Sequence, residues 1–456
     1  MVVFSSVEFI FRFMPVFMII YWIAPGAAKK YILFAGSILF YAVGSGWFTL
    51  LLLGATLFNF LLGNWIYMKP GRRLRPARAA QRKKYLRIAV GTDVFLLVLC
   101  KILALKVNAA LLPLGMSFYI FKMISFQADI YTGKIEVRPG FINTAVYFSM
   151  FPQVTQGPIM RYGEGNFEQE RRITLRAVED GMVFFVIGLG MKVLLADRIG
   201  ILWNELTKIG YESISTPLAW LGAYAYSFQL YFDFWGYSLM AGGLAMMLGF
   251  PLIRNFTHPY AASGVSDFYR RWHATLGSWF RDYVYIPLGG SREGAFKTIR
   301  NLLAVWLLTG FWHGGSLNFI IWGAVLGLII IWEKYPARML LERFPLLGHL
   351  HTIILIPLTW VIFAVTNLQE LEIYFSRLFP FFNQGVAVWK GDIFKYLGIY
   401  WPYLLASVVL CVPAAYNLVV MNRRHPAVIA LLTGVFWWSV YMLVNNAGNT
   451  FMYFTF

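Results

Sequence analysis

Two histidines in this 456-residue chain occur in settings that suit proton transfer. His313 lies in Gly-Phe-Trp-His-Gly-Gly, at the junction of two apolar stretches where an imidazole is costly to desolvate. Such a ring would be neutral and able to accept a proton, and the flanking glycines leave room for a substrate to approach. These are the properties of a general base, although a lone membrane histidine can also be a hydrogen-bonded packing residue.

The second histidine, His273, belongs to a stretch over residues 250–299 that is more polar than the rest of the chain. Ser266 is predicted to cap a helix that starts at Asp267 and carries His273. On that helix Asp267 and Arg271 stand four residues apart, so they can form an ion pair. The helix is too polar to span a membrane and too aromatic to be solvated, so it should lie buried. His273 could equally be only a packing residue.

The elements that position these histidines are predicted to be membrane helices. The chain is 59% hydrophobic and 13% charged, and helix-length apolar runs follow one another along it. The net charge of +18 comes from basic residues gathered in short loops. Loop charge of this kind sets membrane topology and predicts no nucleic-acid partner. No metal-binding, nucleotide-binding or serine-hydrolase motif is present.

The apolar runs predict an all-α, polytopic integral membrane protein with about 11–14 transmembrane helices and some short re-entrant or interfacial helices. No linker or repeat divides the chain, so we expect one domain over residues 1–456. The predicted spans lie near 7–24, 31–44, 47–67, 88–106, 111–130, 141–157, 178–197, 217–234, 236–252, 299–312, 315–333, 351–367, 396–418 and 427–445.

Loop charge also predicts the topology. The stretch 68–87 carries nine basic residues and no acid, and it should be cytoplasmic together with Lys29–Lys30. The uncharged hairpin 44–46 then lies outside, and so does the N-terminus. Arg423–Arg424 should lie inside, which places the C-terminal Phe456 outside.

The two histidine motifs together resemble the membrane-bound O-acyltransferase family, and within it the alginate O-acetyltransferase branch. They read D-F-Y-R-R-W-H-A-T-L-G-S-W-F-R-D-Y-V-Y-I-P-L-G-G at 267–290 and G-F-W-H-G-G at 310–315. Three further elements of that branch are similar here: V-F-S-S with F-I-F at 3–6 and 9–11, P-Q-x-x-x-G-P-I-x-R-Y at 152–162, and F-D-F-x-G-Y-S at 232–238. Leu239 and Lys122 depart from the family's pattern.

The resemblance implies a multi-pass enzyme of the bacterial cytoplasmic membrane, with its core motifs within about 110–335, that transfers an acyl group to a hydroxyl. The family's catalytic histidine corresponds to His313, and its second motif histidine corresponds to His273. We expect the following residues to position the substrates: Asp233, Asn255, Asp267, Arg270, Arg271, Arg281 and Trp312.

The implied reaction needs no bound cofactor or metal. A cytoplasmic thioester, most simply acetyl-CoA, would present its acyl group, with Arg270, Arg271 and Arg281 holding the anionic donor. The acceptor would be an exported polysaccharide, reached directly or through an extracytoplasmic acetyltransferase of the SGNH type. Two alternatives stay open: a relative that transfers D-alanine to teichoic acid, and a transporter or flippase in which His313 and Asp233 relay protons.

Overall fold

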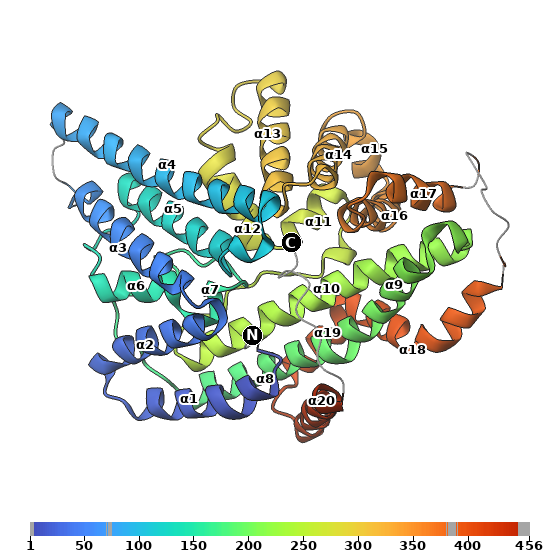
Figure 1. Cartoon of the computed structure of the whole chain (residues 1–456), viewed down its shortest axis with the longest axis horizontal. Helices are drawn as coiled ribbons and strands as arrows, with labels where there is room; N and C mark the ends of the chain where they lie inside the picture. The colour runs from blue at the N-terminus through green and yellow to red at the C-terminus, as the bar shows by residue number, and fades with distance from the viewer. Residues whose placement is uncertain are drawn as a thin grey trace. The chain divides into compact units, whose positions relative to one another are not determined.

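The computed structural model describes residues 4–69, 71, 75–379, 381, 389 and 391–445. Val3, Arg72, Arg73 and Phe456, on which predictions above depend, lie outside these ranges. All regular structure in the described ranges is helical, which confirms the predicted all-α class (Figure 1). The helices form two compact units, one of residues 1–185 with 238–254 and the other of residues 186–237 with 255–456.

The first unit is built from the N-terminal helices. They are α1 (Met14–Ile23), α2 (Gly26–Ser45), α3 (Phe48–Ile66), α4 (Pro76–Lys106), α5 (Met116–Thr132), α6 (Phe141–Ser149), α7 (Phe151–Val154) and most of α8 (Leu175–Gly190). Helices α3, α4 and α5 lie side by side, and α2 packs against α6 (Figure 1).

The second unit holds both histidine motifs. Its helices are α9 (Asp197–Ile209), most of α10 (Thr216–Met247), α11 (Val265–Arg271), α12 (Ala274–Phe280), α13 (Ala295–His313), α14 (Leu317–Lys334), α15 (Arg338–Arg343), α16 (Pro345–Ala364), α17 (Leu368–Leu378), α18 (Asp392–Cys411), α19 (Pro413–Met421) and α20 (Pro426–Asn445). The antiparallel pair α13 and α14 packs closely, and α11 contacts both α14 and α16.

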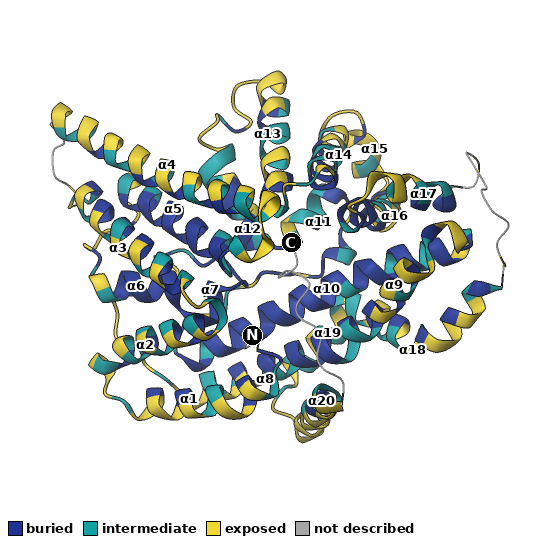
Figure 2. Cartoon of the chain, in the orientation of Figure 1, coloured by how far each residue is buried: buried dark blue, intermediate teal, exposed yellow. Residues whose placement is uncertain are grey.

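Eight helical segments in the described ranges are long and apolar enough to cross a membrane: α2, α3, α4, the segment 109–132 that contains α5, α14, α16, α18 and α20. Their outer faces carry exposed apolar residues, as Figure 2 shows for α20, whose Trp437 and Trp438 are both exposed. Large exposed apolar faces on many helices match a lipid environment. The polytopic membrane class is confirmed, with fewer qualifying helices than the 11–14 that the apolar runs predicted.

Several predicted spans have different bounds in the structure. The runs 217–234 and 236–252 form one helix, α10, which is buried along most of its length (Figure 2). Gly236 lies inside α10, where a side chain would meet the Gly188 carbonyl oxygen at 2.6 Å. The glycine therefore permits close helix packing. The run 141–157 is wrong as a span, since it breaks at Met150 ahead of Pro152.

The break between α6 and α7 explains Lys122, which departs from the family's pattern. Its side chain is buried, and Nζ donates to the Tyr147 carbonyl oxygen at 3.1 Å and to Gln153 Oε1 at 2.9 Å. The Tyr147 carbonyl belongs to the last turn of α6, where backbone acceptors lack helical partners. Lys122 thus supports the backbone of this break.

Residues 76–87 of the basic stretch are helical rather than part of a loop. Helix α4 begins at Pro76, twelve residues before the predicted span. Proline is favourable in a first helical turn, and the Ala, Arg, Gln and Lys residues that follow are strong helix formers.

Candidate active site

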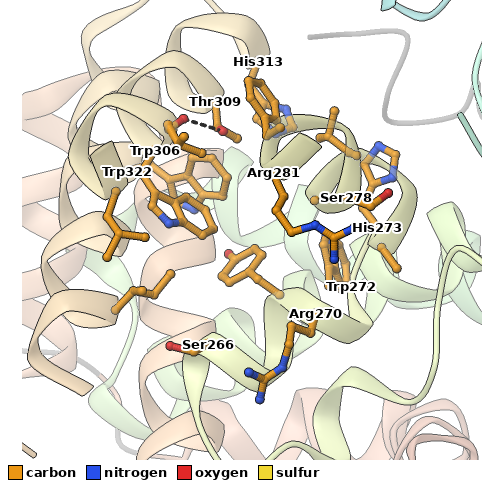
Figure 3. Close-up of a pocket in the computed structure, with 18 of the residues that line it drawn as sticks. Ser266, Arg270, Trp272, His273, Ser278, Arg281, Trp306, Thr309, His313 and Trp322 are labelled. Carbon is orange, nitrogen blue, oxygen red and sulfur yellow. Dashed lines mark hydrogen bonds between the residues drawn. The ribbon is translucent and has the colours of Figure 1, made fainter. Parts of the chain in front are cut away.

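The second unit contains a cavity of about 380 Å³, within the usual range for small-molecule sites. Residues from α10 to α14 and α16 line it, and most of the lining is aromatic or aliphatic. His273 and His313, forty residues apart in the chain, both face this cavity (Figure 3). Fold and packing therefore bring the two predicted histidines to one site.

His273 does not lie on a helix, contrary to the sequence prediction. Helix α11 starts at Val265 rather than Asp267 and ends at Arg271, so Ser266 lies in its first turn instead of capping it. His273 has a left-handed backbone (φ 45°) between α11 and α12, a conformation that is uncommon for any residue except glycine. The segment Asn255–Thr257 holds this break, since the Asn255 carbonyl accepts from the backbone N–H that follows His273 (2.9 Å).

The Asn255 side chain fixes the protonation of the His273 ring. Asn255 Oδ1 accepts from the Thr275 hydroxyl at 2.8 Å and from the Thr275 backbone N–H at 3.4 Å, so this atom is the amide oxygen. His273 Nδ1 lies 2.9 Å from the same oxygen and must therefore donate. Nε2 is left with its lone pair, and it has no hydrogen-bond partner among the described residues.

Burial keeps the His273 ring neutral. The residue is 3% exposed, and burial lowers the pKa of its imidazole to about 3. Phe234 packs edge-on against the ring with centroids 4.7 Å apart. A neutral imidazole with a bare Nε2 at a cavity can accept a proton or a hydrogen bond.

His313 is the last residue of α13 and is half-buried. Its ring meets Trp322 and Phe363 edge-on, with centroids 5.2 and 5.1 Å apart. Two of the nearby glycines have packing roles. Side chains at Gly310 and Gly314 would come within 2.3 Å of the Phe319 carbonyl oxygen and ring, respectively. These glycines let α13 approach the start of α14 closely.

Two of the three predicted arginines reach the cavity. Arg270 and Arg281 line it, and both side chains are mostly exposed (Figure 3). Arg271 instead pairs with Asp267 at 2.8 Å, which confirms the predicted i,i+4 pair, and Arg270 also contacts Asp267 at 3.2 Å. Burial acts to raise the pKa of Asp267, but hydrogen bonds from the two arginines hold it below its ordinary value.

Three other predicted residues, Asp233, Asn255 and Trp312, do not line the cavity. Asp233 pairs with the buried Lys192 at 2.9 Å, and Lys192 is also bonded to Asp197. Phe234, the next residue after Asp233 in the chain, lines the cavity. Trp312 contacts the His313 ring with centroids 4.6 Å apart. Asn255, Asp233 and Trp312 thus border lining residues without forming the cavity wall.

Sequence reasoning missed Glu333. This buried residue of α14 accepts from the backbone N–H groups of Val265 and Ser266, which are unpaired donors at the start of α11, and from the Ser266 hydroxyl. His351 Nε2 lies 3.2 Å from the same carboxylate. A carboxylate near the end of an apolar span is the signal that could have identified it.

Comparison with known proteins identifies the family of the chain. The model of the MBOAT (membrane-bound O-acyltransferase) family matches residues 74–375, which include both histidines and the whole cavity lining. The chain belongs to this family. It is an acyltransferase, as the motifs predicted.

Three relatives are named for acyl transfer to polymers of the cell envelope or exterior. A probable alginate O-acetylase, AlgI, from Pseudomonas putida is 35% identical over 83% of this chain and 80% of its own length. A peptidoglycan O-acetyltransferase from Helicobacter pylori is 30% identical over 80% of this chain and 78% of its own. A teichoic acid D-alanyltransferase from Bacillus subtilis is 29% identical over 46% of this chain and 56% of its own.

Proposed function

We propose that this chain transfers an acetyl group from a cytoplasmic thioester, most simply acetyl-CoA, toward hydroxyl groups of an exported polysaccharide. The observation that carries the proposal is the shared cavity of His273 and His313 in a member of this family. The relatives named as acetylating alginate and peptidoglycan match over more of the chain than the D-alanyltransferase does. This difference favours acetyl over D-alanyl transfer.

In the proposed reaction His313 acts as the general base. Its imidazole takes the proton of the acceptor hydroxyl while the oxygen attacks the thioester carbonyl. The tetrahedral intermediate then expels the thiolate, which takes that proton from His313, leaving an acetyl ester and a free thiol. In the neutral ring, His273 Nε2 accepts a hydrogen bond and cannot donate one. We therefore propose that it orients the O–H or S–H group of a substrate.

The walls of the cavity suit this chemistry. Trp306, Trp322 and Phe363 line it and exclude water, which would otherwise hydrolyse the thioester. Arg270 and Arg281, whose side chains are mostly exposed, offer positive charge to the phosphates of a CoA-type donor. The acceptor would approach from the extracytoplasmic side, directly or through a partner acetyltransferase, in the bacterial cytoplasmic membrane with both termini outside.

The decisive experiment replaces His313 by Ala and measures O-acetyl groups on the cell's exported polysaccharide. Membrane levels of the variant are matched to wild type, and His425→Ala serves as the control because His425 lies between α19 and α20, away from the cavity lining. We expect loss of acetylation in His313→Ala alone. Unchanged acetylation in that variant contradicts the assignment of the base.

The donor is tested separately with purified protein. Incubation with acetyl-labelled CoA and, in parallel, with a D-alanyl carrier protein shows which thioester is consumed when a hydroxyl acceptor is present. Consumption of acetyl-CoA that depends on His313 supports the proposal. Consumption of the aminoacyl carrier alone would assign the chain to D-alanyl transfer.

A further inference from the structure

The first unit carries a cationic surface that the acyl-transfer site does not use. Helix α4 continues about three turns beyond its apolar part, and these turns contain several basic residues. Between residues 68 and 92 the chain has no acidic residue. The basic side chains fall into two groups that point in different directions.

The first group faces the unit and caps neighbouring helices. Arg82 is buried, and it donates to the carbonyl oxygens of Ile66 at 2.6 Å and Tyr131 at 2.9 Å. Arg78 donates to the Trp65 carbonyl at 2.7 Å. These acceptors belong to the last turns of α3 and α5, where carbonyl groups lack helical partners and the helix dipole attracts a cation.

The contacts of Arg82 show at what depth in the membrane the second group of basic side chains lies. Helices α3 and α5 are both candidate spans, and Arg82 sits where both of them end. A span ends where its backbone leaves the hydrocarbon, so Arg82 marks the interfacial region. Trp65 and Tyr85 meet at the same level with ring centroids 5.3 Å apart, which is the usual place for amphipathic aromatic residues.

The second group consists of Lys83, Lys84 and Arg87, which we call the α4 cationic groove. These three exposed side chains, with Ala80 and Ile88, border an open groove of about 500 Å³. None of the three has a carboxylate partner in the part of the chain that the structure describes. Arg87 lies about 7 Å deeper along the helix axis than Arg82, a depth from which a long side chain can reach the interface.

We propose that the α4 cationic groove binds the phosphate of an anionic phospholipid. Three unpaired cations at the interfacial level, above an apolar helix face, match a headgroup phosphate with acyl chains below it. A soluble polyanion would not need the apolar residues Ala80 and Ile88 in the groove, nor a site at the depth of the span ends. The groove belongs to the first unit, so it is separate from the histidine cavity.

The test uses the purified full-length protein in detergent with equal amounts of phosphatidylglycerol and phosphatidylcholine, followed by native mass spectrometry of the retained lipids. We expect wild type to retain phosphatidylglycerol preferentially. The variant Lys83→Gln/Lys84→Gln/Arg87→Gln should bind it roughly a hundredfold more weakly, since each of the three basic residues near an anionic surface contributes about fivefold.

Two further variants keep the test decisive. Lys106→Gln/Lys208→Gln/Lys395→Gln removes the same charge from other exposed sites and should keep the preference. Lys83→Arg/Lys84→Arg/Arg87→Lys keeps the charge and should also bind. Equal retention by the Gln triple variant and wild type overturns the proposal. The proposal is also overturned if wild type retains both lipids equally. Equal retention is the result expected if the groove binds an acidic protein instead of a lipid.

Discussion

Lys122 in the first unit and His273 in the second are both buried polar residues, at 1% and 3% exposure, yet their surroundings differ. Lys122 donates to two oxygens at the break between α6 and α7, and it lines neither the histidine cavity nor the α4 cationic groove. His273 uses Nδ1 to bind Asn255 and keeps Nε2 at the edge of a cavity. A buried polar group with a structural role has its hydrogen bonds satisfied by neighbouring residues. One available for chemistry has a polar atom without a partner that faces a cavity.

Of the two residues compared here, His273 should have the larger effect on kcat. We expect His273→Asn to lower kcat by about a hundredfold, because loss of the Nε2 acceptor misplaces the group that it orients. Asn tolerates the left-handed backbone of this position, so the melting temperature in detergent should change little. Measuring both quantities on the same preparation checks this. A variant with normal kcat would show that His273 is as structural as Lys122.

Asn255 sharpens the comparison because its side-chain oxygen binds His273 Nδ1 directly. Asn255→Leu should lower kcat by about 10–100-fold, the usual loss when a residue that orients a histidine is removed. Asn255→Asp retains an acceptor for Nδ1, and its carboxylate would raise the pKa of His273 from about 3. Because the neutral ring is the active form, the acidic limb of the pH–rate profile should move to higher pH. A profile identical to wild type in Asn255→Asp would contradict the assigned tautomer.

Lys122 should show the opposite pattern. Lys122→Met keeps the side-chain length but leaves the Tyr147 carbonyl and Gln153 without their donor. A buried unsatisfied acceptor costs about 1–3 kcal/mol, so thermal stability in detergent should fall. The amount of folded protein is measured by size-exclusion chromatography. The activity per folded molecule should equal that of wild type. A selective fall in kcat would break the contrast between the two residues.

The smallest expected effect is at Asp267, whose pairs with Arg270 and Arg271 are partly exposed. Asp267→Asn should cost about 0.2–1 kcal/mol at neutral pH. The folded-state pKa of Asp267 is lowered, so its contribution is complete above the unfolded-state pKa and disappears as the pH falls through the folded value. Thermal melts of variant and wild type should therefore converge below about pH 4. A stability difference that persists in acid would exclude these ion pairs as its cause.

Some features were readable from the sequence because they depend on composition and local pattern. Long apolar runs predicted membrane helices, and the spacing of Asp267 and Arg271 predicted their pair. The residue types around His273 and His313 indicated the site, and resemblance indicated the family.

Other features depend on contacts between distant segments, which no local pattern encodes. Local propensity predicted an unbroken helix through His273. Instead, the Asn255 carbonyl accepts from the Ala274 N–H and the Thr257 N–H donates to the Arg271 carbonyl, and these bonds hold a left-handed break there. Glu333 meets α11 from a helix more than sixty residues away in the chain. The sequence by itself determined which side chains were available for acyl transfer. Only the tertiary structure decided which nitrogen of His273 stays free, because that depends on the oxygen placed 2.9 Å from the other one.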